Sequence, residues 1–245
     1  MSQQNTSVTT NEPKIIVITG ASKGLGKAIA AQFAAAGCTL LVCARGELQL
    51  YKMMEDILLQ YPECTIKAMP CDMSVKEEVI AFANWCLKYG VPDIVVNNAG
   101  QFLPGAIHNE TEGLLEQMIQ TNLYSAYYLT RALLPKMMER KSGSIFNICS
   151  IASLQAYANG GSYSISKYAL LGFSKNLREE LKPFGIKVSA VMPGATYTDS
   201  WVGSGIEESR IMEADDVAKM VFAASQLSAQ AVMEDIVLRP QLGDL

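Results

Sequence analysis

The chain has 245 residues, of which 49% are hydrophobic, and its formal net charge is −4. This length and composition suffice for one sizeable core, and α/β folds of this size commonly form a single domain. The mild charge, without blocks of like charges, argues against sequence-independent binding to nucleic acid or an anionic membrane, and no apolar run approaches the roughly 18 residues of a membrane span.

Residues 1–13 are polar and lack the apolar core of a signal peptide. We therefore expect a disordered leader, followed by one dinucleotide-binding catalytic domain over residues 14–245. The six cysteines form no CxxC pair, and several lie in apolar strand-like runs, so buried free thiols in a reducing cytoplasm are expected. The single histidine, His108, leaves no ligand cluster for zinc, and no metal site is predicted.

From residue 14 onward, short β-branched runs alternate with helical stretches. The apolar runs predict strands at 14–19, 39–43, 65–69, 93–97, 144–149, 186–192 and 234–238. Helical spacing predicts helices at 24–37, 46–60, 75–89, 113–139, 161–183 and 214–227. This alternation indicates an α/β fold with a Rossmann-type, doubly wound, seven-stranded parallel sheet and helices on both faces. Ligands bind such sheets beyond the carboxyl ends of the strands, so the residues after each strand are the candidate site.

A glycine-rich turn, TGASKGLG at residues 19–26, follows the first strand. Glycines at a strand–helix junction let the backbone approach a pyrophosphate, and the helix start supplies free N–H donors. Glycine is also the default residue of tight loops, so the turn alone is weak evidence. Its place directly after an apolar first strand favours dinucleotide binding.

The choice of cofactor is a question of charge, because NADPH carries an extra phosphate on its adenosine ribose. Glu47 is a candidate for the acid that binds the ribose of NADH, but it lies beyond the second strand, where a helix start favours acids anyway. Arg45 at the tip of that strand and Lys23 in the glycine-rich turn place two cations around one phosphate. We therefore expect NADPH.

Tyr163 and Lys167 are four residues apart near the start of a predicted helix, so they share one helical face. A free tyrosine titrates near pH 10, but an ammonium at ~4 Å favours the phenolate by roughly 4 kcal/mol at an effective dielectric of ~20. This predicts a lowered pKa for Tyr163, suited to acid–base work. Ser150 ends a strand, where its hydroxyl reaches the ligand edge of the sheet. YxxxK alone is a common chance pattern; beside Ser150 and a dinucleotide turn it predicts a proton-transfer site.

In these motifs and their order, residues 14–240 resemble the short-chain dehydrogenase/reductase family, in its NADP-preferring branch. The shared pattern also includes Asp72 after the third strand, NNAG at 97–100 and PGATYT at 193–198. Ala44 stands where NAD-preferring relatives carry an acid, which further discounts Glu47. The resemblance implies an NADP(H)-dependent oxidoreductase acting on a small-molecule alcohol or carbonyl.

The resemblance assigns a role to each residue of the candidate site. Tyr163 is the implied general acid/base, while Lys167 lowers its pKa and holds the nicotinamide ribose. Ser150 positions the carbonyl, and Asn122 supports a proton-relay water. The implied cofactor-binding residues are Gly20, Ser22, Lys23, Gly24, Leu25, Gly26, Arg45, Asp72, Met73, Asn98, Ala99, Gly100, Tyr163, Lys167, Pro193, Gly194, Thr196 and Thr198, with Asp72 at the adenine and the two threonines at the nicotinamide end.

The segment after Pro193 is expected to select the substrate. Tyr197 and Trp201 suit a flat conjugated ligand, and Asp199 suits a nitrogen-rich ring; alternatively, Trp201 packs on the core and Asp199 only begins a short helix. This segment, with residues 243–245, resembles the bacterial sepiapterin-reductase type, which implies reduction of a pterin side-chain ketone. The candidate substrate-contacting residues are Ser150, Tyr163, Tyr197, Asp199 and Trp201.

Two other functions remain open. The tail also resembles the 3-hydroxyacid (serine-type) dehydrogenases, which need a cationic carboxylate anchor, and Arg210 is the arginine close to the substrate segment. A non-catalytic NADPH-binding sensor can lose the tyrosine, lysine or serine, whereas all three are present here. The family resemblance further implies a homodimer or homotetramer built on the helices at 113–139 and 161–183.

Overall fold

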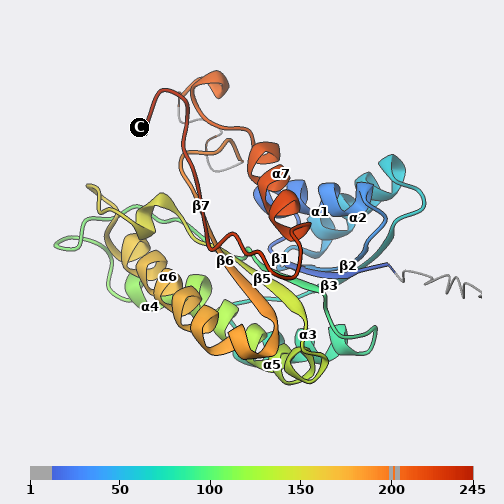
Figure 1. Ribbon diagram of the computed structural model, residues 1–245. Coiled ribbons are helices and arrows are strands. Elements are labelled where there is room, and N and C mark those ends of the chain that lie inside the picture. Colours follow the sequence, from blue (N-terminus) through green and yellow to red (C-terminus); the bar gives the residue numbers. More distant parts are fainter. Residues whose placement is uncertain (1–12, 199–200, 202–204, 245) are drawn as a thin grey trace, which may run out of the picture.

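A computed structural model describes residues 13–198, 201 and 205–244 (Figure 1). Apart from Pro13, the predicted leader therefore lies outside the described residues. The strands are β1 (Ile15–Thr19), β2 (Thr39–Ala44), β3 (Thr65–Pro70), β4 (Ile94–Asn97), β5 (Gly143–Ile148), β6 (Ile186–Pro193) and β7 (Asp235–Leu238). The α-helices are α1 (Gly24–Ala35), α2 (Glu47–Gln60), α3 (Lys76–Leu87), α4 (Leu114–Ile119), α5 (Ser125–Arg140), α6 (Gly161–Leu181) and α7 (Ala214–Ser225). Short turns of other helix types are η1 (Gln120–Tyr124), η2 (Ile151–Ser153), η3 (Lys182–Phe184) and η5 (Glu208–Arg210).

The seven strands form one parallel sheet in the order β3-β2-β1-β4-β5-β6-β7. β1 is an inner strand: Ile16 pairs with Leu40 of β2 on one side and with Ile94 of β4 on the other. A strand covered on both faces needs apolar side chains in both directions, which is why these strands read as continuous apolar runs. The predicted Rossmann-type fold is confirmed.

Helices cover both faces of the sheet: Figure 1 shows α1, α2 and α7 on one face and α3, α5 and α6 on the other. Within β1, Ile16 and Ile18 face the first layer, where Phe33 of α1 is fully buried. Val17 faces the second layer, where Phe82 of α3 is fully buried. Each such side chain contributes roughly 1.5–3 kcal/mol by leaving water, so the two cores hold the strand ends in fixed positions.

The strand order reverses between β1 and β4, and this reversal determines where a ligand can bind. From β1 the chain moves outward to β2 and β3, then returns past β1 to continue with β4. The connections after β1 and β4 therefore run to opposite sides and leave a crevice at the carboxyl ends of these strands. The glycine-rich turn after β1 and the NNAG motif at the end of β4 both lie there.

The helix predicted over 113–139 is not one regular α-helix. A π-helical turn, η1, separates α4 from α5 and contains Asn122. A π-turn accommodates one extra residue, and such turns often occur at functional sites. The apolar pattern indicated a long helix correctly, but a change of helix type leaves no signal in that pattern.

All six cysteines are buried free thiols. Over the described part of the chain, no helix combines the length and the apolar character needed to cross a membrane.

Candidate active site

The turn between β1 and α1 depends on glycine at three positions. Gly20 and Gly24 have φ angles of +64° and +54°, in the left-handed region that favours glycine. A Cβ on Gly26 would lie 2.3 Å from the carbonyl oxygen of Gly20 and 2.6 Å from Nδ2 of Asn98. Gly20 and Gly24 line the adjoining cleft, whereas Gly26 is not among its described lining residues and instead permits close packing of α1 on the turn.

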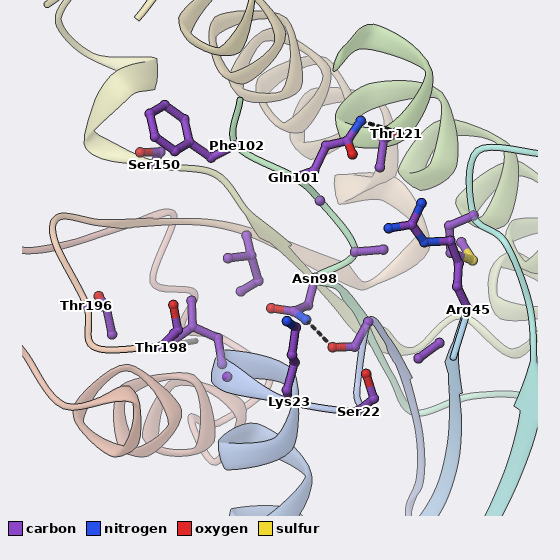
Figure 2. A pocket seen from close by; sticks show the side chains of 18 of the residues that line it. Ser22, Lys23, Arg45, Asn98, Gln101, Phe102, Thr121, Ser150, Thr196 and Thr198 are labelled. Carbon is purple, nitrogen blue, oxygen red and sulfur yellow. Dashed lines mark hydrogen bonds between the residues drawn. The ribbon is translucent and has the colours of Figure 1, made fainter. Parts of the chain in front are cut away.

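Asn98, just after β4, fixes this turn from the neighbouring strand. Its Nδ2 donates to the carbonyl oxygen of Thr19 at 2.9 Å and to that of Gly20 at 3.0 Å, and Figure 2 draws the bond to Gly20. In return, Oγ1 of Thr19 accepts from the backbone N–H groups of Asn98 and Ala99 at 3.0 and 2.9 Å. The ends of β1 and β4 are therefore tied together, with Gly100 exposed toward the cleft.

The cleft along these strand ends has a volume of about 610 Å³, within the usual range for cofactor and small-ligand sites. α1 begins at its edge with Gly24, and the side chain of its N-cap residue, Lys23, makes no capping hydrogen bond to the helix start. Uncapped N–H groups and the positive end of the helix dipole favour an anion there. The left-handed glycines, the uncapped helix start and the cations lining the cleft fit the pyrophosphate and phosphate groups of NADP(H).

Cations gather where the adenosine ribose of a dinucleotide would lie. Ser22, Lys23 and Arg45 line the cleft; Figure 2 shows Ser22 and Arg45 toward one end and Ser150 toward the other. Ala44 at the end of β2 is buried and brings no acid to the strand tip. Glu47 begins α2 and is not among the described residues that line the cleft. This arrangement favours a ribose that carries a phosphate.

Asp72 and Met73 follow β3 and line the same region of the cleft. The carboxylate of Asp72 also shapes its own turn, because Oδ1 accepts from the backbone N–H and the hydroxyl of Ser74 at 2.9 and 2.7 Å. Gln49 of α2 lines the cleft too, and sequence reasoning missed it. Its only signal is a position in the first turn of the helix that follows β2.

Lys167 lies buried in α6 at the floor of the cleft, with 5% of its surface exposed. Its Nζ donates to the carbonyl oxygen of Ile148 at 2.8 Å and lies 5.8 Å from the ring centre of Tyr163. Burial lowers the pKa of Lys167 to about 8, because a charged ammonium loses hydration there. The lysine therefore titrates closer to neutrality than a lysine in water.

The predicted lowering of the Tyr163 pKa is wrong in this structure. Burial raises the pKa of Tyr163, and a hydrogen bond with Ser150 only partly opposes that rise. The ammonium of Lys167 donates to the carbonyl oxygen of Ile148, and the loss of hydration at the phenol has the largest influence on the pKa of Tyr163. A tyrosine with a raised pKa keeps its proton at neutral pH, so Tyr163 is in its proton-donating form there.

Ser150 comes two residues after the end of β5. Its Oγ accepts from the backbone N–H of Ala152 at 3.1 Å, which makes Ser150 the N-cap of η2. The Ser150 side chain also lowers the pKa of Tyr163, against the effect of burial, and both residues line the cleft. The strand tip and the helix therefore bring together the serine and tyrosine that the sequence separates.

The end of the cleft that holds Ser150 and Tyr163 is called the catalytic end here. Asn122 is buried and is not among the described residues that line the cleft. Its Nδ2 donates to the carbonyl oxygen of Gln101 at 3.0 Å and to Oγ of Ser166 at 2.9 Å, and its Oδ1 accepts from the N–H of Gln101 at 2.8 Å. Ser166 in turn donates to the carbonyl oxygen of Tyr163 at 2.7 Å. Asn122 thus connects the segment after β4 with the first turns of α6.

Three residues at the catalytic end were missed by sequence reasoning: Gln101, Phe102 and Thr121. The ring of Phe102 meets that of Tyr163 edge to face, with centroids 4.9 Å apart at 76°, and 46% of Phe102 is exposed. Figure 2 shows Phe102 and Ser150 at the same end of the cleft. The available signal was that Gln101 and Phe102 directly follow NNAG, since residues after a strand face the ligand edge.

The segment after β6 completes the wall of the cleft. Pro193, the last residue of β6, lines it together with Gly194, Thr196 and Thr198, all four of which are predicted cofactor-binding residues. Oγ1 of Thr196 donates to the carbonyl oxygen of Gly194 at 3.0 Å, so the side chain helps to fix its own loop.

Three predicted substrate-contacting residues come later in the same segment: Tyr197, Asp199 and Trp201. Tyr197 and Trp201 are not among the described residues that line the cleft. Tyr197 is partly buried, and its backbone N–H donates to the carbonyl oxygen of Met212 at 2.7 Å. Trp201 is partly buried, with its N–H bonded to the carbonyl oxygen of Thr198 at 2.9 Å. Asp199 lies outside the described residues.

Comparison with known proteins gives a consistent result. The family model described as short chain dehydrogenase matches residues 14–208. Sepiapterin reductase of Chlorobaculum tepidum is 31% identical over 240 residues, covering 94% of this chain and 98% of that protein. The alcohol dehydrogenase of the archaeon Thermococcus sibiricus, solved in complex with 5-hydroxy-NADP, superposes with a TM-score of 0.86 at 27% identity, covering 94% and 97% of the two chains. Serine dehydrogenase of Escherichia coli gives a TM-score of 0.80 at 28% identity, covering 94% and 100%.

Proposed function

This chain belongs to the short-chain dehydrogenase family, and we propose that it is an NADPH-dependent carbonyl reductase. The observation that carries the proposal is that Ser150, Tyr163 and the buried Lys167 line the same cleft as the glycine-rich turn. When bound, NADPH supplies the hydride that reduces a carbonyl carbon. The side chains at the catalytic end then have to bind, orient and protonate the carbonyl oxygen.

The hydroxyl groups of Ser150 and Tyr163 both donate hydrogen bonds to the carbonyl oxygen in the proposed mechanism. As negative charge develops on that oxygen, the proton of Tyr163 moves to it and completes the alcohol. This step needs a phenol that is protonated before the reaction, and burial raises the pKa of Tyr163, which keeps the proton on it. The ammonium of Lys167 stabilises the negative charge left on the phenolate. Asn122 donates to the hydroxyl of Ser166, which donates to the backbone carbonyl oxygen of Tyr163, and so helps to position Tyr163.

We assign NADPH as the cofactor because Lys23 and Arg45 line the cleft near the end of β2, where Ala44 stands in place of an acid. A dianionic phosphate gains charge-assisted hydrogen bonds from such cations. The related alcohol dehydrogenase, solved with 5-hydroxy-NADP, supports the same choice.

A flat, conjugated ketone such as a pterin side-chain ketone is our preferred substrate. The exposed ring of Phe102 offers an aromatic wall beside Tyr163. A second aromatic side chain, Tyr157, is also exposed and lies near Tyr163. Burial, together with the neighbouring Tyr163, raises the pKa of Tyr157 to about 12. The similarity to a sepiapterin reductase, at 31% identity, supports this substrate class.

Oxidation of a 3-hydroxy acid is the second candidate, favoured by the similarity to serine dehydrogenase. Its carboxylate anchor would be Arg210. The guanidinium of Arg210 instead donates to the backbone carbonyl oxygens of Gly243 and Asp244 at 3.0 and 3.2 Å. Because these contacts already engage Arg210, the second candidate ranks below the ketone.

A substrate screen separates the two candidates. Purified protein is assayed with sepiapterin in the reducing direction and with L-serine and 3-hydroxyisobutyrate in the oxidising direction, using NADP(H) and NAD(H) in parallel. We expect NADPH oxidation with the pterin ketone. Absence of turnover with any pterin ketone would reject this substrate, and turnover of the hydroxy acids alone would establish the second candidate.

Tyr163→Phe tests the mechanism against a non-catalytic NADPH-binding sensor. Loss of the general acid should lower kcat roughly 10²- to 10⁴-fold. NADPH binding, followed by fluorescence, should remain unchanged, since the phenyl ring preserves the packing with Phe102. Equal turnover by the variant would overturn the assigned role of Tyr163.

We also propose a homodimer or homotetramer. Leu115, Tyr124, Ile165 and Tyr168, from α4, η1 and α6, are exposed although apolar or aromatic. Met118, by contrast, is fully buried, so part of the predicted apolar face covers the molecule's own core. Light scattering of the purified chain tests this, and a monomer at micromolar concentration would exclude it.

A further inference from the structure

The loop between β4 and α4, residues 98–113, is joined to the first turn of α6 through one carboxylate. Oε1 of Glu110 accepts from the hydroxyl of Ser162 at 2.5 Å, and its Oε2 accepts from the backbone N–H of Ser162 at 3.3 Å. Ser162 is 1% exposed and directly precedes Tyr163. Glu110 is partly buried and is not among the described residues that line the cleft, so it is placed to act through other residues.

The backbones of the two segments also meet without room for side chains. A Cβ on Gly161 would lie 2.4 Å from the carbonyl oxygen of Gly105 and 2.7 Å from Oε2 of Glu110. The N–H of Gly105 donates to the carbonyl oxygen of Asn159 at 3.1 Å, and Asn159 has a left-handed φ of 60°. The loop and the helix start are therefore held together by three hydrogen bonds and a close glycine contact.

The start of α6 needs this partner because it has no cap of its own. Its N-cap is Gly160, and no side chain caps the helix from that position. The first N–H groups of a helix lack partners within the helix, and a carboxylate there also interacts favourably with the helix dipole. Glu110 supplies that carboxylate from a segment far away in the sequence.

The same loop carries Phe102, whose ring meets Tyr163 edge to face at 4.9 Å. The Glu110–Ser162 contact thus lies between the helix that carries the proton donor and the loop that carries the aromatic wall. We propose that Glu110 is a positioning residue, which locks residues 98–113 onto α6 and so fixes Phe102 and Tyr163 relative to each other. The catalytic consequence rests on the function proposed above.

Enzyme kinetics test whether the Glu110–Ser162 contact affects catalysis. Glu110→Ala should lower kcat for the ketone roughly 10- to 100-fold, because a small displacement of a reacting group is costly, and NADPH affinity should stay unchanged. Ser162→Ala should act in the same direction. Glu110→Gln keeps an acceptor for the Ser162 hydroxyl and should recover most of the activity. Glu112→Ala, at an exposed position of the same loop, is the matched control and should equal the unaltered chain.

Hydrogen exchange tests, without any substrate, whether Glu110 joins residues 98–113 to α6. In Glu110→Ala, peptides covering residues 101–113 and 157–167 should both lose protection, while peptides from β1 to β2 keep theirs. Unchanged exchange at 157–167, or an equal loss over the whole chain, would overturn the proposal. If the unaltered chain reduces no ketone, the proposed function fails, but the exchange result still decides whether Glu110 joins the two segments. Lost protection with kcat unchanged would show that the lock does not position Tyr163.

Discussion

The two ends of the cleft are built in different ways. At the cofactor end, one contiguous stretch, residues 19–26, supplies the left-handed glycines and the start of α1, and residues after β2 and β3 complete the wall. The catalytic end is assembled from the segments after β4 and β5 and from the first turns of α6. A site made by consecutive residues leaves a readable spacing, whereas a site made by three distant segments depends on how the sheet and helices pack.

The largest expected effect concerns the backbone packing of the cofactor end. Gly26→Ala places a Cβ 2.3 Å from the Gly20 carbonyl oxygen, and overpacking of this kind costs about 1–3 kcal/mol of stability. We expect a lower melting temperature together with strongly weakened NADPH binding, measured by thermal unfolding and fluorescence titration.

Gly172→Ala is the matched control for that variant. A Cβ at Gly172 of α6 meets nothing within 4 Å, and alanine is preferred to glycine inside a helix by about 0.5–1 kcal/mol. Stability should stay equal or rise, with NADPH binding unchanged. If both variants behaved alike, the cofactor end would not depend on the close approach at Gly26.

Arg45→Ala tests whether the cofactor end distinguishes NADPH from NADH by charge. A hydrogen bond to a charged group contributes about 1.5–3 kcal/mol, so the ratio of kcat/KM for NADPH to that for NADH should fall roughly 10- to 150-fold. kcat at saturating cofactor should change little. An unaltered ratio would remove Arg45 from the phosphate site.

Lys167 lies where the two ends meet, and pH probes it. Burial lowers its pKa to about 8, so its ammonium is present below pH 8 and is lost as the pH rises. kcat/KM for ketone reduction, which reports the free enzyme, should be flat below pH 8 and fall up to about tenfold per unit above it. A rate that rises through pH 8 in the reducing direction would contradict the role of the charged lysine.

The lowered pKa of Lys167 also predicts how the stability of the fold changes with pH. Between pH 8 and 10.5 the unfolded chain holds a proton on Lys167 that the folded chain has released. Since the unfolded state binds more protons in this range, the free energy of unfolding should rise with pH there, relative to Lys167→Met. Chemical denaturation of both proteins at several pH values measures the difference, and parallel curves would refute the shift.

The smallest expected effect concerns the aromatic wall of the catalytic end. Edge-to-face contacts contribute about 0.5–1.5 kcal/mol, so Phe102→Ala should raise KM for a flat ketone roughly 2- to 12-fold. NADPH affinity should not change. Phe102→Leu, which keeps an apolar side chain, is the control that separates aromatic contact from simple burial; equal KM values for all three proteins would exclude Phe102 from the substrate site.

The sequence by itself determined the fold and the cofactor end. Strands such as β1 are apolar on both faces because helices cover both, and the turn at 19–26 has its chemistry in its own backbone. The pairing of Tyr163 with Lys167 was also readable, because four residues make about one helical turn.

Only the tertiary structure decided the rest. The pKa of Tyr163 depends on how much water the packed cleft excludes, which the spacing to Lys167 does not reveal. The π-helical turn at Asn122 leaves no signal in the apolar pattern of its helix. The ring of Phe102 against Tyr163 and the Glu110 cap of α6 join residues far apart in the chain. Local spacing records neighbours along one helix or turn, whereas contacts between segments exist only after the sheet and its two helical layers have packed.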